Sequence, residues 1–102
     1  MLNKLVIGTA NFGMTYGQGD HAEKLSEKAI REIIELAKCH GIQTLDTAIS
    51  YGDCSQRLGN IDVKEWKIIT KVPQIPNNIS NVFEWVEHII YKSVKEIGIS
   101  SF

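Results

Sequence analysis

The stretch GIQTLDTAISYG, residues 41–52, decides the fold of this 102-residue chain. Gly41 sits where the glycine that follows a helix belongs. Within a few residues the chain reaches Thr-Leu-Asp-Thr-Ala at 44–48, which we interpret as a strand. The stretch therefore predicts a helix that passes directly into a strand, with Asp46 on that strand.

The residues before this stretch complete a first strand-helix unit. Leu5-Val6-Ile7 predicts a buried strand that ends at Gly8, followed by a loop over 9–21. Ser26 is expected to cap the helix that Gly41 closes. Apolar residues recur at helical spacing in this segment: Leu25, Ala29, Ile33, Leu36 and Ala37.

The residues after it continue the same alternation. A short helical stretch is expected over 55–60 and a third strand over 66–72, stopped by Pro73 and Pro76. A long helix closed by Gly98 follows, and one apolar face is marked by Phe83, Val86, Ile90, Val94 and Ile97. Residues 99–102 resemble the approach to a fourth strand.

Strands separated by helices predict a parallel α/β sheet with right-handed connections, because a tight hairpin cannot join parallel strands. A chain of this length forms one small domain at most, here residues 1–102. Eleven basic residues against twelve acidic ones give a net charge of −1, which lacks the clustered positive charge that nucleic acid and anionic membrane surfaces require. No run approaches the ~18 apolar residues of a membrane span.

Cysteine and histidine spacing adds no metal or redox site. Cys39 and Cys54 form neither a C-x-x-C motif nor a disulfide framework, so we expect reduced thiols and a cytoplasmic protein. His21, His40 and His88 share no ligand spacing with other metal-binding residues, and we interpret all three as structural.

Two nucleotide-binding motifs fail. Gly8 and Gly13 have the spacing of a phosphate-binding loop, but Met14 stands where the lysine should be, and the next helix begins too late to face the phosphates. No G-x-G-x-x-G opens the first helix, which excludes a dinucleotide-binding fingerprint of that type.

Three polar residues fall at or just beyond predicted strand ends: Asp46, Tyr51 and Lys71, here called the polar trio. Each alone has an ordinary structural explanation, but the carboxyl ends of parallel strands meet at one edge, where ligands bind. Alternation places Lys71 on the face opposite Ile68. We expect Asp46 to pair with it, because a buried unpaired ammonium is costly.

At these residues the chain resembles the N-terminal third of an aldo-keto reductase. The resemblance rests on Gly8-Thr9-Ala10-Asn11-Phe12-Gly13, the stretch 41–48, Tyr51-Gly52, Leu58-Gly59 and Ile68-Ile69-Thr70-Lys71-Val72. It implies the first part of a (β/α)₈ TIM barrel and NADPH-dependent reduction of small aldehydes and ketones. The family's tetrad is Asp, Tyr, Lys and His, of which the first three fall on Asp46, Tyr51 and Lys71. It also implies Thr9 and Asp46 as cofactor contacts.

The chemistry of such a reduction explains the polar trio. Hydride transfer to a carbonyl carbon leaves negative charge on the oxygen, which a nearby acid must protonate. Tyr51 would be that acid. Lys71 would stabilise the phenolate left behind, and Asp46 would hold Lys71 in place.

The chain departs from the family pattern in two places. Residues 54–56 are Cys-Ser-Gln where the family usually has a Glu, and no residue corresponds to the tetrad His, since His88 falls inside a helix. A barrel needs ~250 residues, so the sequence predicts an incomplete barrel with unpaired sheet edges, marginal stability, self-association through those edges, and no activity of its own.

Three interpretations stay open at this point. The chain is a fragment of a reductase, a non-enzymatic remnant of one, or a small α/β interaction module that completes its sheet with a partner. The substrate, the choice between NADPH and NADH, the oligomeric state and the origin of the short length also stay open, because specificity in this fold comes mainly from later loops.

Overall fold

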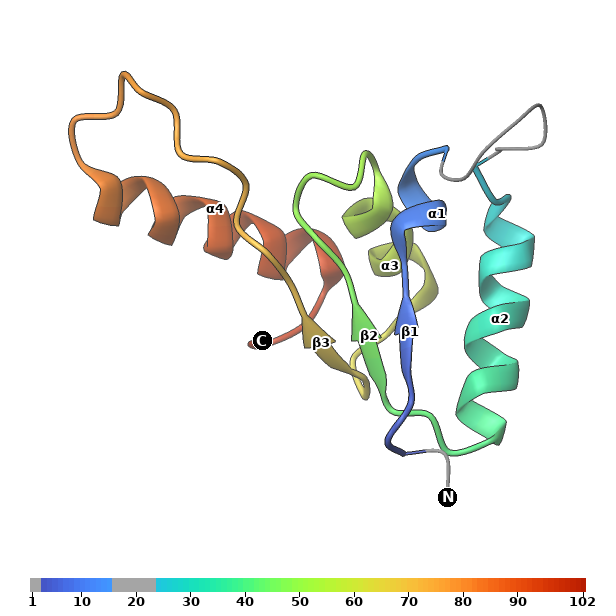
Figure 1. Ribbon diagram of the computed structural model, residues 1–102. Helices are drawn as coiled ribbons and strands as arrows, with labels where there is room; N and C mark the ends of the chain where they lie inside the picture. The colour runs from blue at the N-terminus through green and yellow to red at the C-terminus, as the bar shows by residue number, and fades with distance from the viewer. Residues whose placement is uncertain (1–2, 16–23) are drawn as a thin grey trace.

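The computed structural model describes residues 3–15 and 24–102. The elements in order are β1 (Val6–Gly8), α1 (Ala10–Gly13), α2 (Glu27–Cys39), β2 (Thr44–Asp46), α3 (Cys54–Ile61), β3 (Lys67–Ile69) and α4 (Val82–Ile97). The strands form one parallel sheet in the order β1-β2-β3 (Figure 1). The predicted parallel α/β class is confirmed, and the three described strands form an open sheet.

Local capping explains where the two long helices begin and end. The Ser26 side chain accepts a hydrogen bond from the Ala29 N–H at 3.2 Å, and Gly41, just beyond α2, has a φ of +82°. In α4 the Asn81 side chain accepts from the Glu84 N–H at 3.1 Å. Gly98 closes that helix, also at a φ of +82°. Both predicted glycine stops are confirmed.

The segment after β1 differs from the sequence prediction. A loop was expected over 9–21, but Ala10–Gly13 form the short helix α1. Phe12 on this helix is only 2% exposed and packs in the core. The burial of this side chain explains why the segment is helical. Residues 16–21 of that predicted loop, including His21, lie outside the described residues.

All three strands have three residues, so β2 and β3 are shorter than predicted, whereas β1 has the predicted length and is shifted by one residue. β2 ends at Asp46 instead of 48, and β3 at Ile69 instead of 72. The chains stay side by side beyond these ends: the Thr47 N–H donates to the Ile69 carbonyl at 2.8 Å, and the Ile49 N–H to the Lys71 carbonyl at 3.2 Å. These two hydrogen bonds continue the pairing without a regular ladder, and the chain then turns, with the Tyr51 N–H donating to the Ala48 carbonyl at 3.1 Å.

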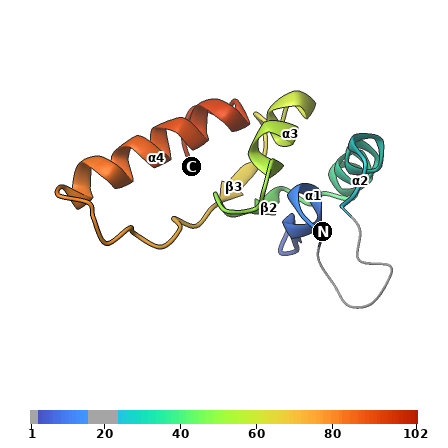
Figure 2. The same ribbon diagram turned by 90° about the horizontal axis from the view of Figure 1, so that it is seen from above.

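The register separates the two faces of the sheet. Ile7, Leu45 and Ile68 are aligned and face the core under the helices. Figure 2 shows α2, α3 and α4 on that same side of the sheet. The core comprises Phe12, Ile30, Ile34, Ala37, Leu45, Cys54, Leu58, Val63, Trp66, Ile68 and Ile97. We call the opposite side, which bears Val6, Asp46 and Ile69, the open face.

Helix α4 packs only at its C-terminal end. There it contacts α3 at Gly59. Only a glycine allows this close approach, because a Cβ at position 59 would lie 2.1 Å from the Glu96 carbonyl oxygen. Ile97 is buried, but the rest of the predicted apolar face is not: Phe83 is 74% exposed, near the end that extends past the sheet in Figure 1. No helix within 3–15 and 24–102 is both long and apolar enough to cross a membrane.

Candidate functional site

The polar trio lies together at the carboxyl end of the sheet. Asp46 ends β2, Tyr51 belongs to the loop between β2 and α3, and Lys71 follows β3. The Lys71 Nζ donates to Asp46 Oδ1 at 2.7 Å, so the pair expected from strand alternation is present. The same ammonium lies 5.5 Å from the centroid of the Tyr51 ring. One cation is therefore shared between a carboxylate and a phenol.

A second hydrogen bond fixes the ammonium. The Lys71 Nζ also donates to the backbone carbonyl of Thr47, again at 2.7 Å. The hydrogen bond to Asp46 raises the pKa of Lys71 above its usual 10.5; the charge of Asp46 and the nearby Tyr51 act in the same direction, against lost hydration. Lys71 therefore stays protonated at physiological pH.

The environment of this pair differs from the sequence expectation in one respect. A buried ammonium is expected from the sequence, but the side chains of Lys71 and Asp46 are 52% and 41% exposed. They lie on the open face, whereas the helices cover the other side of the sheet. The charge pair is consequently screened by water and contributes little to stability.

Two glycines position the Tyr51 loop. Gly52 has a φ of +54°, and a Cβ built on it would lie 2.0 Å from the Gly13 carbonyl oxygen. A Cβ on Gly13 would lie 1.8 Å from the Tyr51 carbonyl oxygen. The end of α1 and the Tyr51 loop thus meet backbone to backbone, which only glycine at both positions permits.

Thr9 lies beneath the rim rather than on it. The residue is fully buried, and both its N–H and its hydroxyl donate to the Asp46 carbonyl, at 3.0 Å and 3.1 Å. These bonds tie the end of β1 to the end of β2. The Thr9 hydroxyl is therefore engaged within the protein, whereas the half-exposed Asp46 carboxylate is accessible to a ligand.

The thiol of Cys54 is buried next to Thr9. Nothing in the sequence pattern predicts this contact. Cys54 Sγ lies 3.4 Å from Thr9 Oγ1 and 3.5 Å from Thr47 Oγ1. Cys54 was interpreted only as an unreactive, reduced thiol. It is free and buried, and it links α3 to the ends of β1 and β2 directly below Asp46.

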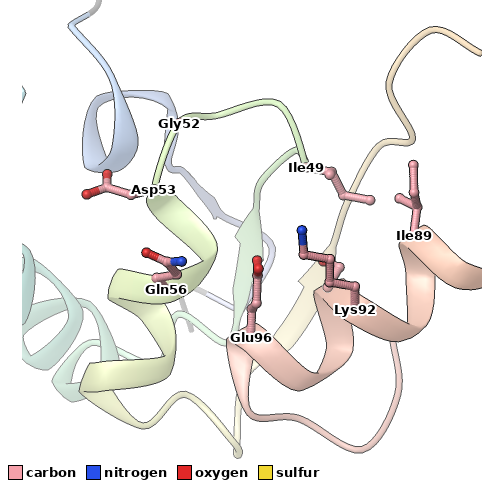
Figure 3. Close-up of a pocket in the computed structure, with 8 residues that line it drawn as sticks. Ile49, Gly52, Asp53, Gln56, Ile89, Lys92 and Glu96 are labelled. Atoms are coloured by element: carbon pink, nitrogen blue, oxygen red, sulfur yellow. The ribbon is translucent and has the colours of Figure 1, made fainter. Parts of the chain in front are cut away.

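A crevice of about 340 Å³ lies between α3 and α4, at the foot of the Tyr51 loop (Figure 3). At its edge, Asp53 pairs with Lys24 at 3.4 Å and with Arg57 at 3.3 Å. Burial acts to raise the pKa of Asp53, but the hydrogen bond from Lys24 and the charges of Arg57 and Lys24 outweigh it. The pKa therefore lies below its usual 3.8.

The described histidines stand apart from the polar trio. His40 caps the end of α2, and His88 is exposed on α4, inside a helix as expected. In the described part of the chain, no three metal-ligating side chains come together.

Comparison with known proteins identifies the fold. No protein-family profile and no curated protein matches the sequence. Two solved structures, both of proteins from Pseudomonas aeruginosa provisionally assigned as aldo-keto reductases, match 92% of this chain at 23% identity, with TM-scores of 0.74 and 0.70. The chain spans only 38% and 36% of those proteins. It thus has the fold of the opening βα units of an aldo-keto reductase barrel.

Proposed function

We propose that this chain supplies the proton-donating part of an NADPH-dependent carbonyl reductase site. The observation that carries the proposal is the Lys71 ammonium, held by Asp46 at 2.7 Å and placed 5.5 Å from the Tyr51 ring centroid. This is the arrangement needed to polarise a phenol at the end of a parallel sheet. Its position agrees with the fold shared with the Pseudomonas aeruginosa proteins.

The roles follow from the contacts. A bound reduced nicotinamide would supply the hydride. The Tyr51 hydroxyl would donate a proton to the oxygen of a small aldehyde or ketone, and the Lys71 ammonium would stabilise the phenolate that remains. Asp46 and the Thr47 carbonyl keep Lys71 protonated and oriented.

The residues fit the cofactor in part. The Asp46 carboxylate is 41% exposed at the rim, so it has room to accept a hydrogen bond from a ribose hydroxyl or an amide. Thr9 is less suited to direct contact, because its hydroxyl already bonds to the Asp46 carbonyl. We propose that Thr9 shapes the cofactor site through the backbone of Asp46.

We further propose that residues 1–102 alone do not turn over substrate. The Asp46–Lys71 pair lies half-exposed on the open face, where water competes for its hydrogen bond, and the chain matches little more than a third of the related barrels. An exposed free thiol, Cys39, suits the reducing cytoplasm, which is where we propose the protein acts.

A chimaera tests the catalytic proposal. Residues 1–102 would replace the matching segment of a Pseudomonas aeruginosa relative, and NADPH oxidation would be followed at 340 nm with a panel of aldehydes. We expect aldehyde-dependent oxidation that Tyr51→Phe reduces by ~10²-fold or more. The isolated chain should show none.

The matched control is Tyr91→Phe, which removes a phenol from α4, away from the polar trio. It should leave the chimaera's rate unchanged. A chimaera that shows the helical and thermal signature of the parent barrel yet oxidises no NADPH would contradict the proposal, as would a Tyr51→Phe variant with full activity.

A further inference from the structure

Helix α4 exposes an apolar groove along most of its length. The groove has a volume of about 620 Å³ and is lined by Phe83, Val86, Glu87, Ile90, Tyr91 and Val94 together with the tail residues 100–102. We call this surface the α4 groove. Phe83 is 74% exposed and Tyr91 59%. A continuous apolar surface of this kind marks an interaction site on a small protein.

The shape of the groove fits a helix. Its apolar residues follow the i, i+3, i+7, i+11 spacing of one helical face, from Phe83 to Val94. At a rise of about 1.5 Å per residue, the seam from Phe83 to Val94 is about 17 Å long. Helix-in-groove recognition uses anchors at this spacing.

The charges beside the groove favour a second copy of α4 in antiparallel orientation. Glu84 and Glu87 lie in the N-terminal half of α4, and Lys95 lies in the C-terminal half. The Lys95 Nζ is 4.7 Å from the ring centroid of Tyr91, which places this cation next to the groove. Lys92 belongs to the crevice on the other side of the helix (Figure 3).

We propose that the 102-residue chain forms a two-fold dimer through antiparallel packing of α4 grooves. Pairing centred near residue 89 sets the Phe83 end of each helix against the Val94 end of the other. Glu84 of each chain then faces Lys95 of the second copy, twice by symmetry. The pairing also opposes the two helix dipoles. Because the interface is isologous, it closes at two copies.

The edges of the sheet are poorer docking surfaces. β1 and β3 each have three residues. Lys67, the first residue of β3, and Lys71, two residues after its end, are both exposed. Short edges flanked by lysine resist pairing with another chain. Self-association through the edges remains a prediction from the sequence, separate from the dimer proposed here. The dimer does not depend on the catalytic proposal.

Oligomeric state provides the first test. A seam of this length buries less than a standard interface of about 1,600 Å², so we expect a reversible dimer that dissociates on dilution in sedimentation velocity runs. Phe83→Ser should weaken the dimer at least tenfold. The control, Leu36→Ser, removes a 63% exposed leucine on α2, outside the groove, and should leave the dissociation constant unchanged. Circular dichroism verifies that each variant keeps its helices.

Charge reversal tests the antiparallel arrangement. Glu84→Lys and Lys95→Glu should each weaken self-association, because each places two like-charged contacts in the homodimer. An equimolar mixture of the two variants should associate as strongly as the original chain, since the mixed dimer pairs opposite charges at both contacts. Raising the salt concentration should reduce these differences.

Three results would overturn the proposal. The first is a chain that stays monomeric at ~1 mM. The second is a dimer that Phe83→Ser and Leu36→Ser weaken to the same extent. The third is a mixture of the charge-reversed variants that associates no better than either variant alone.

Discussion

The two faces of the sheet are built from the same three strands but serve different purposes. On the helix-covered face, Leu45 is 0% exposed and Ile68 is 6% exposed. On the open face, Val6 is 46% exposed and Ile69 is 50% exposed, and the half-exposed Asp46–Lys71 pair lies at the rim. Tyr51, by contrast, is partly buried against the core. Most of the buried core therefore lies on one face and the Asp46–Lys71 pair on the other, so substitutions at these positions can separate stability from the candidate chemistry.

The largest expected effect comes from the covered face. Leu45→Ala removes a fully buried side chain from the centre of the sheet and should lower the free energy of unfolding by about 2–5 kcal/mol. Ile69→Ala removes a similar side chain from the open face and should cost less than about 1 kcal/mol, because half of it already contacts water. Urea denaturation measures both. Equal losses would contradict the division between the faces.

Glycines at the rim provide the next test. Gly52→Ala adds a methyl group at a φ of +54° and 2.0 Å from the Gly13 carbonyl oxygen. We expect a loss of more than about 1 kcal/mol and a displaced Tyr51 loop. Gly8→Ala is the matched control, because its Cβ would meet nothing within 4 Å. If both variants unfold at the same urea concentration, the backbone contact between α1 and the Tyr51 loop is not tight.

Much of this arrangement could be predicted from the sequence. Ser26, Gly41 and Gly98 mark helix ends through local hydrogen bonding and backbone conformation, so no tertiary information is needed. The Asp46–Lys71 pair also followed from local rules, namely strand alternation and the meeting of parallel strand ends. These features depend on residues near one another in the sequence or on the regular geometry of a sheet.

The remaining features depend on contacts between distant segments. The sequence pattern of α4 shows an apolar face but not what covers it, and Phe83 proves to be exposed. The burial of Thr9 against Cys54 joins residues 45 positions apart, and neither residue type signals it. Likewise α1 forms because Phe12 reaches the core. Local propensity cannot anticipate these three outcomes.

Substitutions in the polar trio should affect chemistry far more than stability. Asp46→Asn removes the charge that holds Lys71, but both side chains are half-exposed, so the expected loss of stability is below about 1 kcal/mol. In the active chimaera the same change should lower the rate by ~10²-fold or more. Lys67→Met changes a lysine on the same face of β3, away from the rim, and should alter neither. A parallel loss of stability and rate in Asp46→Asn would assign that pair a structural role instead.

The smallest effect is the alkaline pH dependence of the Lys71 contact. Its pKa is raised in the folded chain above the usual 10.5, chiefly by the hydrogen bond to Asp46. A raised pKa means that the folded state holds the proton more tightly, so the contribution to stability is complete below pH 10.5 and is lost as pH rises through the folded pKa. The useful quantity is the difference in the free energy of unfolding between the original chain and Lys71→Met, because every effect that the two proteins share cancels. That difference, followed by urea denaturation from pH 8 to 12, should shrink as the pH rises. A difference that grows with pH would mean that the open face holds Lys71 in its neutral form, which would contradict its role beside Tyr51.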